Sequence, residues 1–206
     1  LIPADEPAPQ DHMDRLAAGG GVIGFRLSSI GGPVDPLAPM DIRTFATYPI
    51  WKHAAEKDYV LWLYPRAVDA HTVPFLIDAF PQVRVVFNHM LACPTKGSFS
   101  WDEKGRPRVE FSQFPPLSRY TTMGLHQYDN VFVHLSGQYA FSKEQWPYRD
   151  LQEWHERLHA PKNRMQGFGA DHLLWATDFP WIAEDPGYEK MVQIVDELLP
   201  ELAADE

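Results

Sequence analysis

The chain has 206 residues and a formal net charge of −10, which argues against nucleic acid or an anionic membrane surface as a partner. Cys93 is its only cysteine, so an intrachain disulfide and a thiolate metal cluster are excluded, and we expect a reducing, cytoplasmic location. No apolar run approaches the roughly 20 residues that a membrane-spanning helix needs.

Predicted helices and apolar strands follow one another along the chain. In chain order they are helix 11–18, strand 22–27, helix 49–56, strand 59–63, helix 69–80, strand 83–87, strand 130–135, helix 142–158, strand 172–176 and helix 188–199. The strand segments are mostly continuously apolar, as expected of strands covered on both faces. Pro49 marks one helix start, and residues 142–145 have the spacing of a capping box at another.

Strands that alternate with helices predict a parallel sheet within one α/β domain over residues 1–206. Five such units suit either an open doubly wound sheet or the later part of an eight-stranded barrel. No glycine-rich phosphate loop follows a strand, which weakens the nucleotide-binding alternative. The chain does not begin with methionine, and we expect it to start inside a longer protein.

The connection between residues 89 and 130 is unusually long. Residues 102–107 within it are typical of a turn between two short strands. Long structured loops after a strand are often lids over a site, and the alternative is a solvated insertion.

Asp178 is the first candidate for chemistry. It follows an apolar strand and is succeeded at once by Phe179, Pro180 and Trp181, which is unusual for a solvated surface aspartate. In β/α enzymes the carboxyl ends of the strands carry the catalytic groups. Trp181 could then form a wall for a bound substrate.

Other polar side chains also follow predicted strands, so we expect them to converge with Asp178. His89 follows the 83–87 strand. An isolated histidine there would more often be a core histidine hydrogen-bonded to backbone, but its pairing with Asp178 favours general acid–base work or shared metal ligation. Further candidates for substrate binding are Arg26, Tyr64, Arg66 and Ser136. Ser136 has no nucleophile-elbow pattern, which argues against covalent serine catalysis.

Several of these segments resemble blocks of the amidohydrolase-related family (amidohydrolase 2). Residues 175–181, Trp-Ala-Thr-Asp-Phe-Pro-Trp, resemble its last-strand motif. Residues 85–89 and 130–137 resemble the two preceding strands, and residues 24–27 resemble a mid-barrel strand with a Gly-x-Arg pattern. The family includes 2-pyrone-4,6-dicarboxylate lactonase-like hydrolases and aminocarboxymuconate-semialdehyde decarboxylase-like enzymes.

The resemblance implies a distorted (β/α)8 TIM barrel of which about the first three strands are missing from this chain. It implies that Asp178 is a metal ligand or the base that activates water, that His89 is a polarising or metal-associated group, and that Arg26 binds a substrate carboxylate. It also implies one divalent metal, zinc or manganese. The family's His-x-His pair and fifth-strand histidine are absent here, so Asp178 and His89 alone would lack the three protein ligands usual in catalytic zinc sites.

Our leading hypothesis is a hydrolase that directs water, with Asp178 as base, at a small lactone or carboxylated ring. A metal-dependent non-oxidative decarboxylase and a non-catalytic barrel subunit are the alternatives. We expect a small anionic substrate as partner, no nucleic acid or membrane, and a possible homodimer through aromatic bulk such as Trp146 and Trp154.

Overall fold

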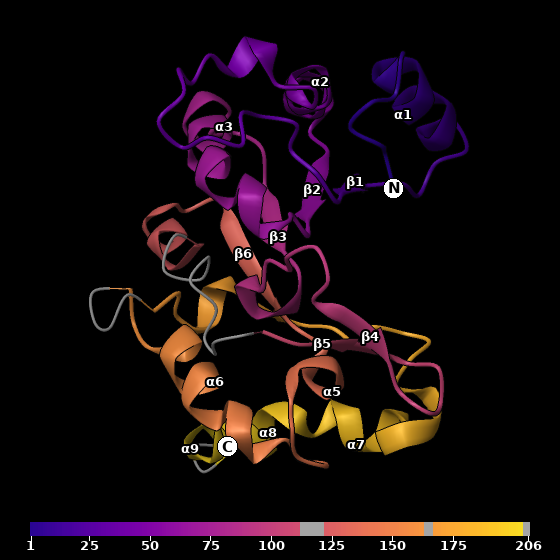
Figure 1. Ribbon diagram of the computed structural model, residues 1–206, viewed down its shortest axis with the longest axis vertical. Helices are drawn as coiled ribbons and strands as arrows, with labels where there is room; N and C mark the ends of the chain where they lie inside the picture. The colour runs from indigo at the N-terminus through magenta and orange to yellow at the C-terminus, as the bar shows by residue number, and fades with distance from the viewer. Residues whose placement is uncertain (112–121, 163–166, 204–206) are drawn as a thin grey trace.

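A computed structural model describes residues 1–111, 122–162 and 167–203 of the chain (Figure 1). Its centre is a parallel sheet with the strand order β1-β2-β3-β6-β7. The strands are β1 (Gly24–Leu27), β2 (Val60–Leu63), β3 (Val85–Phe87), β6 (Val131–Leu135) and β7 (Leu173–Trp175). All five predicted strands are therefore confirmed, each shorter at one or both ends than its apolar run.

Each strand of this sheet pairs in parallel with the strand of the same sheet that comes next in the sequence, so β3 pairs with β6. A doubly wound sheet reverses its strand order at a switch point, which this sheet does not do. Neighbouring strands of this sheet follow one another in sequence, as the consecutive β/α units of a barrel do. The described residues contain five strands of this barrel-like arrangement. Its register aligns Leu27, Leu63 and Phe87 in one row, so these strands end at one edge.

Helices and single helical turns connect the strands, with α1 to α3 in the upper half of Figure 1 and α5 to α9 in the lower half. Within the part of the chain that the structure describes, the α-helices are α1 (Pro9–Ala17), α2 (Tyr48–Lys57), α3 (Val73–Ala79), α5 (Gln138–Phe141), α6 (Gln152–His159), α7 (Tyr188–Val192), α8 (Ile194–Leu198) and α9 (Pro200–Ala203). Pro49 and Pro74 lie in the first turns of α2 and α3, where a missing N–H is harmless. None of the described helices is long and apolar enough to cross a bilayer.

Two helix predictions need correction. The capping box at residues 142–145 is wrong: Ser142 ends α5, and its hydroxyl bonds locally with Glu144 and with the carboxylate of Asp150. A local serine turn of this kind competes with helix formation, so the next α-helix, α6, starts only at Gln152. The helix predicted over residues 188–199 is interrupted between α7 and α8 at Gln193.

The core lies between the sheet and the helices that cover it. Phe25, Leu27, Leu61, Leu63 and Phe87 are all buried on or near the strands. In β6 the burial alternates along the strand, with Phe132 and His134 half-buried and their neighbours buried. Because successive side chains of a strand point to opposite faces, the helix-covered face is the better sealed of the two.

The long connection contains the hairpin that the sequence predicted. Strands β4 (Phe99–Trp101) and β5 (Pro107–Val109) pair antiparallel, and β5 packs against α5 (Figure 1). Lys104 and Arg106 at its turn bind the carboxylate of Asp185, at 3.1 and 3.3 Å. The rest of the connection, residues 112–121, lies outside the described residues.

Truncation of the buried Phe87 to alanine tests this core. We expect Phe87→Ala to lower the free energy of unfolding by about 3–5 kcal/mol, because a fully buried aromatic ring leaves a cavity. The matched control is Phe75→Ala in α3, where the ring is 43% exposed and the loss should stay below about 1 kcal/mol. Urea denaturation followed by circular dichroism measures both. Equal losses in the two variants would contradict this assignment of the core.

Candidate functional site

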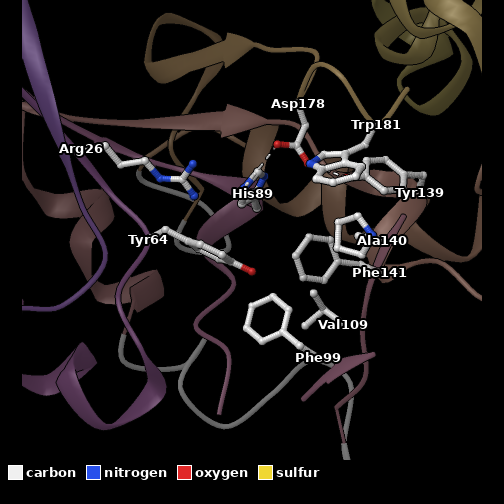
Figure 2. Close-up of a pocket in the computed structure, with 11 residues that line it drawn as sticks. Arg26, Tyr64, His89, Phe99, Val109, Tyr139, Ala140, Phe141, Asp178 and Trp181 are labelled. Carbon is white, nitrogen blue, oxygen red and sulfur yellow. Dashed lines mark hydrogen bonds and ion pairs between the residues drawn. The ribbon is translucent and has the colours of Figure 1, made fainter. Parts of the chain in front are cut away.

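A pocket of about 150 Å³ lies at the carboxyl ends of the parallel strands. Figure 2 shows its side chains, with Arg26 and Asp178 on either side of His89. The lining residues come from β1, from the segments that follow β2, β3 and β7, from the β4–β5 hairpin and from α5: Arg26, Tyr64, His89, Phe99, Pro107, Val109, Tyr139, Ala140, Phe141, Asp178 and Trp181. This is the edge at which β/α enzymes place their catalytic groups.

His89 is held in place by its backbone and by the start of α5. It begins a run of three non-glycine residues in the left-handed region, with φ of 53°, 56° and 63° for His89, Met90 and Leu91. Such a conformation costs about 1–3 kcal/mol for each residue and persists only where the surroundings impose it. The His89 Nδ1 atom lies 3.0 Å from the hydroxyl of Ser136. A Cβ at Gly137, where φ is 75°, would lie 2.9 Å from the same nitrogen.

Asp178 also leaves its strand in the left-handed region, with φ of 58°. Its Oδ2 atom accepts a hydrogen bond of 2.8 Å from the hydroxyl of Tyr139. Its Oδ1 atom faces His89, 3.9 Å from Nε2. That separation is too long for a direct hydrogen bond, so a small polar group has room to bond both atoms.

Arg26 supplies a positive charge to the pocket. Its guanidinium lies 5.5 Å from the centre of the Tyr64 ring, within cation–π range, and it forms no ion pair with a described residue. The Tyr64 ring in turn meets the ring of His89 edge to face, with the centroids 4.7 Å apart. Arg26 is thus oriented by an aromatic face while its charge remains available to an anion.

Burial controls the ionisation of this site. It lowers the pKa of the His89 imidazole below its ordinary value; the Asp178 carboxylate opposes this shift and Arg26 adds to it. Burial also raises the pKa of the Tyr64 and Tyr139 hydroxyls well above their ordinary range, so both stay protonated at neutral pH. Nearby His134 has its pKa lowered to about 4 by burial, with His89 and Arg26 contributing. At neutral pH the site thus combines neutral histidines and hydroxyls with a charged arginine.

The structure brings most of the predicted site residues together. Asp178, His89, Arg26, Tyr64 and Trp181 all line the pocket. Ser136 lies behind His89 as its hydrogen-bond partner and does not reach the pocket wall. Arg66 is not brought to the pocket, because it bonds Asp69 at 3.1 Å and Ser29 at 3.4 Å.

Tyr139 is the polar pocket residue that the sequence analysis missed. It lies three positions after Ser136, just past the strand end, so its place beyond a predicted strand was the available signal. Phe99 and Val109 were also missed as pocket residues. They reach the pocket through the hairpin, whose direction no local pattern specified.

The described residues do not fit a catalytic zinc site. They contain no group of three or more His, Cys, Asp or Glu side chains that could hold a metal. His89 Nε2 and Asp178 Oδ1 are 3.9 Å apart, whereas two ligands of a tetrahedral zinc at about 2.0–2.2 Å lie about 3.3–3.6 Å from each other. Two protein ligands at this separation do not make the three-ligand site that such a metal needs.

Comparison with known families decides which group the chain belongs to. A family model for amidohydrolases matches it over residues 1–206. The chain belongs to the amidohydrolase family. A comparison with curated protein sequences finds no match.

Solved structures of amidohydrolases have a similar fold. A zinc-bound amidohydrolase of Burkholderia multivorans superposes with a TM-score of 0.59 at 18% identity, over 96% of this chain and 63% of the other. A Pseudomonas putida protein assigned as a 2-pyrone-4,6-dicarboxylic acid hydrolase gives 0.55 at 21% identity, over 92% and 60%. The present chain thus spans less than two thirds of either of these proteins. A 2,6-dihydroxybenzoate decarboxylase from Rhizobium, at 0.47 and 15% identity over 94% and 67%, is too distant for a structural argument.

Titration of His89 tests the electrostatics of the site. We expect Arg26→Gln to raise the pKa of His89, because a nearby positive charge is removed, and Asp178→Asn to lower it, because the opposing carboxylate is lost. The imidazole Cε1–Hε1 signal, followed by NMR as a function of pH, measures both shifts. Lys52→Gln, on the exposed face of α2, is the control and should leave the midpoint unchanged. Shifts of the same sign in the two site variants would contradict the geometry.

Proposed function

We propose that this amidohydrolase hydrolyses a small lactone or similarly activated ester on a carboxylated ring, with Asp178 as the general base. The observation that carries the proposal is the 3.9 Å separation of Asp178 Oδ1 and His89 Nε2 at the wall of a pocket that also contains Arg26. The 2-pyrone-4,6-dicarboxylic acid hydrolase of Pseudomonas putida, a similar fold at 21% identity, supports a carboxylated lactone as the first substrate to test.

The separation suits a water molecule as the attacking group. An oxygen about 2.8 Å from both Oδ1 and Nε2 would close this gap with ordinary hydrogen-bond lengths. The second carboxylate oxygen is already occupied by the Tyr139 hydroxyl, so Oδ1 is the atom that accepts a proton from water. Tyr139 thereby orients the base.

His89 acts in its neutral form, because burial lowers its pKa. We place its proton on Nε2, since that atom faces a carboxylate, which only accepts hydrogen bonds. The Ser136 hydroxyl then donates to Nδ1 and fixes this tautomer. Nε2–H becomes a hydrogen-bond donor directed into the pocket.

The reaction then proceeds in two steps. Asp178 takes a proton from water as the water oxygen attacks the lactone carbonyl carbon. Nε2–H of His89 donates to the water oxygen until that oxygen bonds to carbon, and it then donates to the carbonyl oxygen. The charge that develops on the carbonyl oxygen is stabilised by this N–H and by the guanidinium of Arg26. The bond between the carbonyl carbon and the ring oxygen breaks next, and the ring oxygen takes the proton back from Asp178. The product is the ring-opened hydroxy acid, or its keto tautomer where the ring oxygen was enolic.

The pocket walls favour a small, flat ring. Phe99 and Phe141 face the polar groups from the hairpin and α5, and Trp181 meets Trp101 edge to face at 5.9 Å. Aromatic walls bind a ring by stacking, and one cationic residue recognises a carboxylate. A pocket of about 150 Å³ admits a single ring with its substituents.

Replacement of the base tests the proposal directly. We expect Asp178→Asn to lower kcat by at least ~10³-fold on 2-pyrone-4,6-dicarboxylate or on whichever lactone the wild type turns over, since the amide cannot accept the proton. Asp171→Asn is the matched control, because Asp171 is exposed at the other end of β7. Circular dichroism confirms that both variants fold. Undiminished turnover by Asp178→Asn excludes this residue as the base.

Removal of the Tyr139 hydroxyl tests how the base is positioned. We expect Tyr139→Phe to lower kcat by about 10–100-fold with little change in KM, because a hydrogen bond to a charged group contributes about 1.5–3 kcal/mol. Tyr59→Phe, whose ring packs against Phe25 on the far side of the sheet, is the control and should retain full activity. A rise in KM alone would show that Tyr139 contacts substrate and does not orient Asp178.

The two alternatives from the sequence stay predictions. A metal-dependent decarboxylase requires a metal ion, so stoichiometric zinc or manganese in the purified protein, with release of carbon dioxide from a carboxylated ring, would favour it. A non-catalytic subunit predicts no turnover of any ring substrate by the wild type.

A further inference from the structure

A second cavity, of about 450 Å³, lies on the other side of Tyr139 from the candidate active site. It is bounded by the hairpin, by the segment that follows α5 and by α7. Its lining residues are Arg106, Arg108, Tyr139, Lys143, Glu144, Gln145, Trp146, Tyr148, Asp185 and Lys190. The hydrolysis proposed above uses none of these side chains except Tyr139.

Strand β5 and Arg106, the residue before it, divide their side chains between the two cavities. Pro107 and Val109 line the active-site pocket, whereas Arg106 and Arg108 line the second cavity. Alternate residues of a strand point to opposite faces, so this division follows from the backbone. The hairpin thus presents an apolar face to one cavity and a cationic face to the other.

The second cavity is positively charged although the chain as a whole carries −10. Four of its lining side chains are cationic and two, Glu144 and Asp185, are acidic. Lys143 and Lys190 make no ion pair with any described residue. Arg108 donates to the backbone carbonyls of Tyr139 and Ser142, which orients the guanidinium without neutralising it.

The remaining lining groups are ordered. Arg106 is fixed by Asp102 at 2.8 Å and by the Asp185 carbonyl at 2.7 Å, with its side chain only 17% exposed. Burial raises the pKa of Tyr148 to about 12, with Asp185 contributing, so its hydroxyl remains protonated at neutral pH. The rings of Trp146 and Tyr148 meet edge to face at 5.9 Å.

We propose that this second cavity binds a small oxyanion that carries two or more negative charges, as phosphate or carboxylate groups. Three cationic side chains without a carboxylate partner among the described residues, Arg108, Lys143 and Lys190, supply the attraction. Arginine and lysine donors suit oxyanions, and a volume of about 450 Å³ suits a small molecule. This site is independent of the proposed hydrolysis, because its charges lie outside the active-site pocket.

Isothermal titration calorimetry of the purified protein with pyrophosphate and with citrate, at constant ionic strength, tests the site. We expect one molecule to bind per chain and Lys143→Gln/Lys190→Gln to weaken binding by at least tenfold. Lys52→Gln/Lys96→Gln is the matched control, because it removes the same charge from exposed positions elsewhere. Arg26→Gln should bind as the wild type does.

Tighter binding of pyrophosphate would identify the ligand as phosphate-bearing, and tighter binding of citrate would identify it as a carboxylate; either supports the site. Three results would overturn it. They are no binding of either anion at millimolar concentration, equal weakening in the two double lysine variants, or a loss confined to Arg26→Gln, which would place the anion in the active-site pocket.

Discussion

The geometry of the candidate active site depends on two strand ends that leave the sheet in the left-handed backbone region. His89 and Asp178 have φ of 53° and 58°, and neither is a glycine. The parallel register alone would bring the ends of β3 and β7 to the same edge, but the turns redirect both side chains over that edge. Local contacts offset the conformational strain of the turn at His89. Met90 and Leu91 are buried, and the Trp154 indole donates to the Met90 carbonyl at 3.3 Å.

Burial around these turns sets the chemistry that the side chains can perform. A buried histidine with a lowered pKa binds fewer protons than it does in the unfolded chain. His89 and His134 therefore contribute stability above the ordinary histidine pKa, and this contribution is lost as the pH falls below it. At neutral pH both are uncharged, which leaves Arg26 as the cation of the pocket and allows His89 to act as a neutral donor.

The sequence predicted what depends on patterns local to one segment. Apolar runs predicted the five strands, and polar residues at their ends predicted that His89, Arg26 and Asp178 would converge. Tyr139 was missed although it lies just beyond a predicted strand, because it is on the four-residue helix α5, which is too short for a periodic signal to show where its side chain points. The helix start predicted at Ser142 was wrong for a related reason. The capping-box spacing was present, but a contact with Asp150, eight residues away, determined the conformation of Ser142. Arg66 was placed by its own neighbour Asp69, which a strand-end rule ignores.

Tyr139 and strand β5 connect the active-site pocket to the second cavity. The Tyr139 hydroxyl bonds Asp178, its backbone carbonyl accepts from Arg108, and the Arg106 guanidinium lies 5.8 Å from the centre of its ring. A displacement of the β4–β5 hairpin would therefore alter both the apolar wall of one cavity and the cations of the other. The ion pairs of Lys104 and Arg106 with Asp185 oppose such a displacement, and Asp185 belongs to the segment that follows Asp178 in the chain. These ion pairs fix the hairpin and the segment after Asp178 relative to each other. The position of Asp178, the proposed base, therefore depends on contacts made by Asp185, seven residues further along the chain.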